Sequence, residues 1–386
     1  MYPLDAGDEL QEFRQSVRRF AETKLLPGYL DRALSDDYPH EQVAQMGGAG
    51  LFGLCVPESQ GGQGADILSL GVAMEEISYA DVNLGTILFL QTVPATLMAQ
   101  HGSPEVIERW LPGIMAGDII HSLALTEPGA GSDTKALTCR AERVDSGWRI
   151  HGEKTSITQA PVANVATVVA QTDPSLGTKG IGAFVVALDN DETVSRQRFR
   201  DPGARPIGRG SLMFDGTFVP DDHVLVQPGG GLHTVLAEFD LTRTLIALNV
   251  ISAGRRALEM AMAYASERVA FGRPIGVNQG VSFPIAEHMT YLEGIRALAW
   301  QALQLRLAGK PHTTEAAMLK WWAPRASFNA INDAVVIHGH VGWSDELPLQ
   351  AMLRDVSGCQ IGDGTPQIQK MIIARDIARR VAGGQR

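Results

Sequence analysis

Residues 126–133 read Thr126-Glu127-Pro128-Gly129-Ala130-Gly131-Ser132-Asp133, and they lie where the patterning of the chain changes. Before this segment, apolar residues recur three or four positions apart, which predicts helices over 10–26, 41–46, 67–80, 86–101 and 103–115. After it, short apolar or alternating stretches between Gly, Asp and Pro predict antiparallel strands at 148–151, 163–171, 182–188 and 212–218. Long helical patterns then return at 241–268, 282–307, 314–338 and 366–382.

This order predicts a mostly α protein with a separate β domain in the middle. A run of strands with no helix between them argues against a βαβ sheet. We therefore expect a helical domain over 1–119, a β domain over 120–227 and a helical bundle over 228–386.

Composition excludes some classes of function. The 386 residues carry a formal net charge of -10, which argues against general nucleic-acid binding, although a local Arg cluster still permits an anionic substrate. The three cysteines lie far apart, which favours a reducing compartment. The first residues lack a basic segment followed by an apolar core, and no uninterrupted apolar run reaches the roughly 20 residues of a membrane span. We expect a cytoplasmic protein.

Two polar segments border the predicted strands. Gly-rich 126–133 exposes backbone N–H groups that can grip phosphates or the edge of a heterocycle, and an elaborate hairpin loop is the alternative interpretation. The segment Gly152-Glu153-Lys154-Thr155-Ser156-Ile157-Thr158-Gln159 is also polar, and by itself it is equally consistent with an ordinary strand end.

Two further segments flank the long helices. In 268–276, RVAFGRPIG, followed by Asn278-Gln279, the arginines suit either a helix C-terminus or a diphosphate. In 360–369, QIGDGTPQIQ, Thr365 and Pro366 predict an N-cap and the first helical residue. Asp363 is then either a support for that helix start or a functional carboxylate.

Common catalytic motifs do not occur in the sequence. There is no GxGxxG after a strand, no P-loop, no HExxH and no GxSxG. His338 and His340 have a spacing that can chelate a metal on a strand, but no carboxylate or Cys cluster joins them. We predict no metal site.

Together and in this order, the four segments resemble the acyl-CoA dehydrogenase family. The resemblance covers essentially the whole chain, and it includes Pro57-Glu58 with its Gly-rich loop and Phe239-Asp240-Leu241-Thr242-Arg243 at the start of a long helix. It implies an N-terminal helical domain, a middle β domain and a C-terminal four-helix bundle, assembled as a homotetramer. It also implies FAD, lying between the β domain and the bundle and reaching a neighbouring subunit.

The resemblance assigns roles to particular residues. The flavin ring would contact Leu125, Thr126, Ser156, Ile157 and Thr158, with Ser132 between the flavin and the pantetheine arm of the substrate. The FAD of the adjacent subunit would be held by Arg268, Phe271, Gln279, Thr365 and Gln367, and by the segment with Val336, Gly339 and His340. The CoA channel would be lined by Asp240, Arg243 and Arg375, with Gly364 near the thioester.

The implied reaction is α,β-dehydrogenation of an acyl-CoA, in which a carboxylate takes the α-proton and flavin N5 accepts the β-hydride. Asp363 occupies the base position, where most members carry Glu, and its carboxylate is retracted by roughly one C–C bond, comparable to a ~1 Å misplacement. Gly362 stands where an aromatic residue is common. These two differences favour an acyl group that is cyclic or branched near the α-carbon.

Other departures affect the acceptor and the alternative base. Some relatives carry a Glu base at the start of the long helix, where this chain has Thr242, so Asp363 stands alone. Ser156 replaces a Trp that usually shields the flavin, which leaves electron-transfer flavoprotein as the default acceptor and oxygen as an alternative. Val336 and His340 replace a Gln and a Gly.

Three other interpretations stay open. The first is a flavin oxidase of the same fold, of the nitroalkane oxidase type, which also uses an Asp base. The second is a dehydrogenase acting on a carrier-protein-bound acyl group. The third is a non-catalytic subunit of a heteromeric dehydrogenase, against which Asp363, Thr126 and Arg268 argue.

Overall fold

The computed structural model describes residues 7–229 and 231–383, without the side chains of 231–236. The extreme ends of the first and last predicted domains, 1–6 and 384–386, lie outside the described residues. The first domain consists of helices α1 (Asp8–Phe20), α2 (Tyr29–Leu34), α3 (His40–Gly48), α4 (Ile67–Ala80), α5 (Val82–His101) and α6 (Pro104–Ala116). The predicted helix over 10–26 ends in a π-helical turn, Ala21–Leu25, and α2 was not predicted.

Side-chain caps fix where three of these helices begin. Asp66 accepts from the backbone N–H of Ser69, Asp81 from that of Asn83, and Ser103 from that of Val106. By length and composition, α5 is apolar enough to cross a membrane, but 78% of its most apolar window is buried inside the fold. This helix is therefore core of the helical domain.

The middle of the chain forms a mixed sheet. Its strands are β1 (His121–Ala124), β2 (Arg140–Val144), β3 (Gly147–Thr158), β4 (Val165–Gln171), β5 (Ile181–Ala187), β6 (Val194–Arg198), β7 (Arg209–Pro220) and β8 (Val224–Val226). They run in the order β6-β7-β3-β2-β4-β5-β8, with β1 paired to β4. The predicted strands pair antiparallel, β3 with β7 and β4 with β5, but β1 and β4 run parallel.

Helices cover the middle of this sheet. All seven residues of β4 are buried, which explains why this strand is a continuous apolar run rather than an alternating one. Val165 packs in a cluster with residues of α5 and α6, and Val169 in a cluster against which Phe239 packs. The sheet is thereby joined to both helical parts of the chain.

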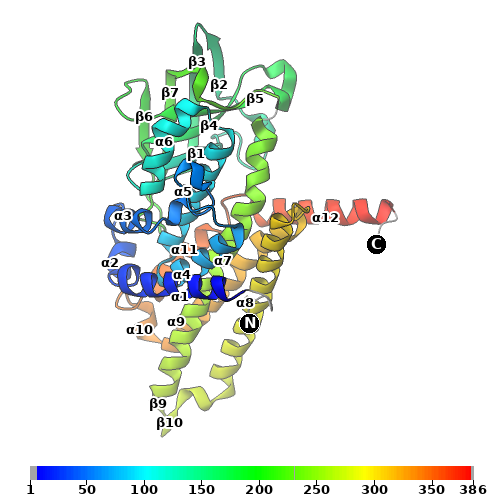
Figure 1. The fold of residues 1–386 in the computed structure, drawn as a ribbon. Coiled ribbons are helices and arrows are strands. Elements are labelled where there is room, and N and C mark those ends of the chain that lie inside the picture. Colours follow the sequence, from blue (N-terminus) through cyan, green and yellow to red (C-terminus); the bar gives the residue numbers. More distant parts are fainter. Residues whose placement is uncertain (1–6, 230, 384–386) are drawn as a thin grey trace.

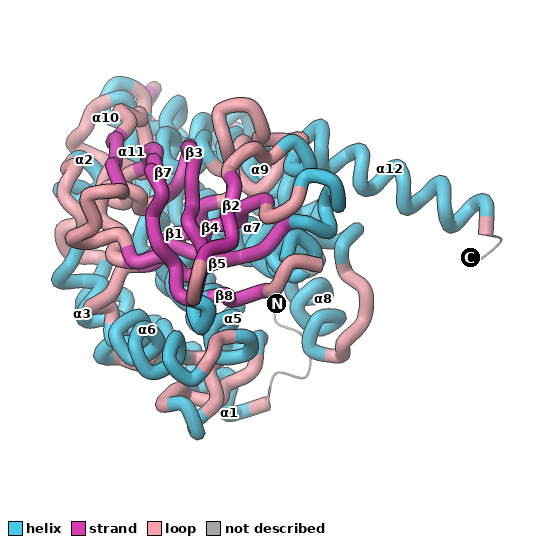
Figure 2. Tube along the Cα trace, turned by 90° about the horizontal axis from the view of Figure 1, so that it is seen from above, coloured by secondary structure: helices cyan, strands magenta, loops and turns pink. Residues whose placement is uncertain are grey.

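The last third is a bundle of long helices. Its members are α7 (Gly231–Glu267), α8 (Gln279–Leu307), α9 (Thr313–His338), α10 (His340–Trp343), α11 (Leu349–Gly358) and α12 (Pro366–Ala382). Helices α7 and α8 extend away from the sheet to the hairpin β9–β10 (Val269–Ala270 and Arg273–Pro274) (Figure 1). Helix α12 projects from the body of the molecule in both views (Figures 1 and 2).

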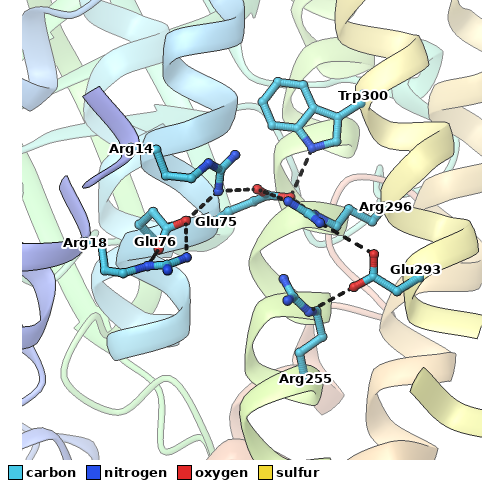
Figure 3. A network of polar contacts seen from close by, with 8 residues as sticks. All are labelled: Arg14, Arg18, Glu75, Glu76, Arg255, Glu293, Arg296 and Trp300. Carbon is cyan, nitrogen blue, oxygen red and sulfur yellow. Dashed lines mark hydrogen bonds and ion pairs between the residues drawn. The ribbon is translucent and has the colours of Figure 1, made fainter. Parts of the chain in front are cut away.

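A buried network of charges joins the first domain to the bundle (Figure 3). Glu75 on α4 accepts from Arg296 Nε and from Trp300 Nε1 on α8, at 2.5 and 3.1 Å, and its other oxygen lies 2.7 Å from Arg14 on α1. Burial opposes ionisation of Glu75, but the two guanidinium groups outweigh it and lower its pKa. The side chains of all three charged residues are at most 6% exposed, so this network is part of the core.

Candidate active site

Asp363 lies in the loop that joins α11 to α12. Its backbone is left-handed (φ +54°), as is that of Gly364 (φ +95°). Asp tolerates this region better than most residues, because its short polar side chain can bond locally. Thr365 is the N-cap of α12 and Pro366 its first residue, as predicted, although the Thr365 hydroxyl makes no capping bond. The turn therefore presents Asp363 at the start of a helix without using its carboxylate as the cap.

The carboxylate of Asp363 is held by the long helix α7. Thr242 Oγ1 donates to Asp363 Oδ2 at 2.6 Å, and Thr242 is 8% exposed. Arg243 Nε and Gln369 Nε2 donate to the backbone oxygen of Asp363 at 3.2 and 2.9 Å. Among the residues that the structure describes, Thr242 is the one that bonds the carboxylate, so Oδ1 is available to accept a proton.

Three of the predicted substrate residues gather around Asp363. Asp240 pairs with Arg243 at 3.0 Å and accepts from Thr313 Oγ1 at 2.5 Å. Gly364 is the next residue along the loop. Arg375 is exposed, three turns into α12, so its predicted place in the substrate channel stays a prediction.

The two predicted flavin segments lie side by side on the sheet. The backbone N–H of Thr155 donates to the oxygen of Thr126 at 2.8 Å. Lys154 Nζ donates to the oxygen of Leu125 at 2.9 Å and pairs with Glu127 at 2.7 Å. Residues 125–127 are therefore tied to strand β3 by a backbone bond and a buried ion pair.

Glu127 also fixes the far side of its loop. Its carboxylate accepts from the N–H and hydroxyl of Thr138 at 2.6 and 2.7 Å and from the N–H of Cys139 at 3.0 Å. Burial raises the pKa of Glu127, but Lys154 and these bonds outweigh it and lower the pKa. Sequence reasoning missed the pair, since Glu127 and Lys154 are 27 residues apart.

Ser156 occupies an irregular position in β3. The pairing with β7 shifts register between Lys154 and Ile157, and Ser156 has φ +59°, so a bulge turns its side chain outward. The Ser156 hydroxyl is exposed and accepts from Arg209, which is itself paired with Asp201 at 2.6 Å. Arg209 is a neighbour that the sequence did not reveal.

The side chains of the other predicted flavin residues differ in exposure. Ile157 is 2% exposed, so only its backbone can contact a ligand, while Thr158 is half-buried and its backbone oxygen accepts from Ser122. Thr126 is half-buried and Ser132 is exposed.

Phe239 links this sheet edge to Asp363. It packs against the cluster that contains Leu125 and Ala130, and the guanidinium of Arg243 lies 5.8 Å from its ring centre. Because Arg243 also bonds the Asp363 backbone, the hydroxyl-rich loop and the carboxylate belong to one continuous packed unit.

The remaining predicted cofactor residues lie in three other segments, apart from Thr365, which follows Asp363 closely in the chain. Arg268, Phe271 and Gln279 surround the hairpin at the far end of α7 and α8 (Figure 1), and Phe271 is fully exposed with φ +53°. Val336 is 69% exposed, and Gly339 and His340 form the junction between α9 and α10, with His340 exposed. Thr365 is beside Asp363, whereas Gln367 is exposed on α12.

The two histidines of the spacing 338–340 have different surroundings. His338 is buried, stacks on Tyr264 at 4.6 Å between ring centres and bonds the backbone oxygen of Ala334 through Nδ1. His340 is exposed at the start of α10. The rings are not on a strand, so the chelating geometry considered from the sequence does not arise.

The donor groups near the sheet fit a flavin dinucleotide. Thr126 and Ser132 in the loop and Thr158 at the end of β3 offer hydroxyl groups. A Cβ added to Gly129 or Gly131 would meet nothing within 4 Å, so the loop leaves its backbone open to a ligand. Apolar residues Leu125 and Ala130 in the core together with these hydroxyls suit an aromatic ring with polar edges.

Helical domain, mixed sheet, helical bundle and a carboxylate beside a hydroxyl-rich loop define the architecture of a flavin-dependent dehydrogenase. Family models match residues 7–118, 122–217 and 229–378 as the N-terminal, middle and C-terminal domains of acyl-CoA dehydrogenase. The chain belongs to the acyl-CoA dehydrogenase family and is an oxidoreductase of FAD-dependent type.

Individual relatives agree over nearly the full length. The acyl-CoA dehydrogenase of Bacillus subtilis is 35% identical over 94% of this chain and 96% of its own. The human mitochondrial short-chain specific acyl-CoA dehydrogenase is 34% identical over 96% and 90%. The structure of butyryl-CoA dehydrogenase from Megasphaera elsdenii superposes with a TM-score of 0.92 at 28% identity, covering 98% of this chain and all of that one.

Proposed function

We propose that this protein dehydrogenates an acyl-CoA between the α- and β-carbons, with Asp363 as the base that removes the α-proton. The observation that carries the proposal is the presentation of Asp363 by a fixed turn beside α7, with one carboxylate oxygen bound by Thr242 and the other available. When bound, FAD supplies the acceptor for the two electrons and the β-hydrogen.

The residues around Asp363 have complementary tasks. An α-proton is a feeble acid, so the base must be held close to it and the developing enolate oxygen must be stabilised. Thr242 orients the carboxylate, while Arg243 anchors its backbone. The loop N–H groups of Asp363 and Gly364 are the donors we assign to the thioester oxygen.

We assign an acyl group that is cyclic or branched near the α-carbon. The Asp side chain is one methylene shorter than Glu, so the α-carbon must approach the loop more closely. Gly362 is exposed, and a Cβ added to it would meet nothing within 4 Å, so no side chain that the structure describes at this position or around it restricts the acyl group. A substrate with extra carbon at this position fits there and brings its α-proton to Asp363.

We also assign the hairpin residues to the cofactor site of a second copy of the chain. Phe271 is fully exposed, and the hairpin is remote from its own sheet (Figure 1). We favour an electron-transfer flavoprotein as the electron acceptor. Oxygen is the alternative, because Ser156 stands in place of an aromatic residue that would shield the flavin.

The test is an anaerobic titration of the purified flavoprotein with butyryl-CoA, isovaleryl-CoA and cyclohexanecarbonyl-CoA, following flavin absorbance. Bleaching by the branched or cyclic thioester, and its loss in Asp363→Ala, would support both assignments. Bleaching that persists in Asp363→Ala would remove Asp363 as the base. A yellow protein bleached by none of the three would favour carrier-bound or nitroalkane substrates.

The substrate assignment has its own test in Asp363→Glu. The longer side chain should shift the preference toward the straight-chain thioester, because the carboxylate then reaches an unbranched α-carbon. An unchanged ratio of kcat/KM between butyryl-CoA and cyclohexanecarbonyl-CoA would contradict the argument from side-chain length. Rapid reoxidation of the reduced flavin by air would favour an oxidase over a dehydrogenase.

A further inference from the structure

A buried lysine lies beneath the loop that carries Asp363. Lys320 on α9 is fully buried. Its Nζ donates to the backbone oxygen of Cys359 at 2.7 Å and to that of Gly364 at 3.5 Å. These two oxygens lie at opposite ends of segment 359–364, which follows α11 and precedes α12. One side chain therefore ties both ends of the loop that presents the base.

A neutral side chain, the amide of Gln369, also binds this loop. Gln369 on α12 is fully buried, and its Nε2 donates to the backbone oxygens of Asp363 and Gly364 at 2.9 and 3.1 Å. Because a trans peptide points its N–H opposite to its oxygen, fixing these oxygens also fixes the direction of the N–H groups that follow them. The left-handed backbone at Asp363 and Gly364 is thus maintained by buried side chains from α9 and α12.

The charge of Lys320 is not neutralised by a bonded carboxylate among the described residues. The charged or titratable groups that face it are Asp363 in the loop, Cys359 at the end of α11 and Arg243 on α7. Burial lowers the pKa of Lys320, and the negative charge of Asp363 opposes that effect. A buried ammonium held only by backbone oxygens costs stability, and the negative charge of Asp363 is the interaction that favours the ammonium most.

On the basis of the proposed role of Asp363, we propose that Lys320 is a positioning residue for this base. It holds segment 359–364 in its left-handed turn, and its positive charge attracts the negative charge of the carboxylate that removes the α-proton. Gln369 performs only the first of these tasks, because it carries no charge.

The test compares pH profiles of kcat/KM for the FAD-loaded enzyme with the thioester, among the three named above, that bleaches the flavin most. Lys320→Met removes the charge and the loop bonds, Lys320→Gln removes the charge but keeps an N–H donor, and Lys320→Arg keeps both. We expect the acid limb to move to higher pH by roughly one unit in the first two variants, because an opposite charge close to a carboxylate favours its ionised form. It should stay in place in Lys320→Arg.

Gln369→Leu is the matched control. It removes neutral bonds to the same loop, so it should lower the plateau of kcat/KM without moving the acid limb. An acid limb that stays unmoved in Lys320→Met and Lys320→Gln, with Asp363→Asn inactive, would overturn the role of Lys320 and leave Asp363 as the base. Wild-type rates in Asp363→Asn would instead overturn the proposed function itself.

A second measurement requires no turnover. Lys320→Met should lower the unfolding temperature more, or raise it less, in the wild type than in the Asp363→Asn background, because the favourable charge interaction is already absent in that background. Equal losses in the two backgrounds, or failure of Lys320→Met to fold in both, would mark Lys320 as a structural residue only and overturn the proposal.

Discussion

The buried ion pair between Lys154 and Glu127 gives the sharpest stability prediction. Lys154 is fully buried and Glu127 is 3% exposed. Lys154→Met would leave the Glu127 carboxylate with its bonds to residues 138–139 but without its cation, and the oxygen of Leu125 without its donor. Breaking a buried pair from one side costs about 3–5 kcal/mol.

That cost converts into a measurable shift in unfolding temperature. At about 2.1 cal/mol/K per residue, the unfolding entropy of 386 residues is roughly 0.8 kcal/mol/K, so the midpoint should fall by roughly 4–6 °C. Thermal unfolding followed by circular dichroism measures this, and FAD content after gel filtration should fall as well, because residues 125–127 lose the Lys154 bonds to β3 and keep the backbone bond of Thr126.

The control for this prediction is the double variant Lys154→Met/Glu127→Gln. It removes both charges of the pair, and the amide oxygen of the new glutamine side chain can still accept from one of the two N–H groups of residues 138–139, which donate to different oxygens of Glu127. We expect it to recover part of the lost stability relative to Lys154→Met. If the double variant is no more stable than the single one, or if Lys154→Met unfolds within about 1 °C of the wild type, the pair does not stabilise the loop as argued.

Three further predictions follow from other contacts. Thr242→Val should lower kcat/KM by roughly 10- to 100-fold, because it removes a hydrogen bond to the charged Asp363. Thr242→Ser keeps the hydroxyl and should retain the rate. Equal losses of kcat/KM in the two variants would contradict a role for the hydroxyl. Arg296→Met should destabilise the fold by about 3 kcal/mol at neutral pH. The difference in unfolding free energy between this variant and the wild type should shrink as the pH falls. The reason is that the pKa of Glu75 is lowered in the folded state, so protonation of Glu75 in acid removes the stability that its ion pairs supply. Burial raises the pKa of Asp355 to about 7, so the folded wild type binds that proton more tightly than the unfolded chain and loses stability as pH rises from 4 to 7. The unfolding free energy of Asp355→Asn relative to wild type should then rise by about 3–4 kcal/mol between pH 4 and pH 7, and a flat difference would refute the shift.

The long elements could be predicted from the sequence because their patterns are local. The helices over 67–80 and 366–382 were predicted with the observed bounds, and the helix over 314–338 was predicted to within one residue. Elements with few residues were missed, including α2, α11 and the strands β1, β6 and β8. The short strands and α2 take their pairing partners and packing surfaces from distant parts of the chain, so their own sequence signals them weakly. Helix α11 does carry a local signal, because Leu349, Met352 and Val356 recur at helical spacing, and the prediction overlooked it.

In the candidate site, too, the residues within sequence motifs were predicted and a residue outside them was missed. The residues around Asp363 were found because motifs mark them, and the structure joins Asp240, Thr242 and Arg243 to the same turn. Lys320 was missed, since a lysine in the middle of a long helical pattern looks like any solvated residue. Its burial depends on how α9 packs against the loop before α12.

The hairpin that carries Phe271 has a consequence for mixtures of variants. Helix α7 places Thr242 beside Asp363 at one end and leads to the hairpin at the other, a separation of roughly 38 Å at 1.5 Å per residue. If the hairpin completes the site of a second copy, a variant altered at Phe271 and one lacking Asp363 are each inactive alone. A mixed pair still contains one site in which both parts are intact. Co-expression of the two should therefore restore activity through interallelic complementation, and the yield should follow the fraction of mixed assemblies.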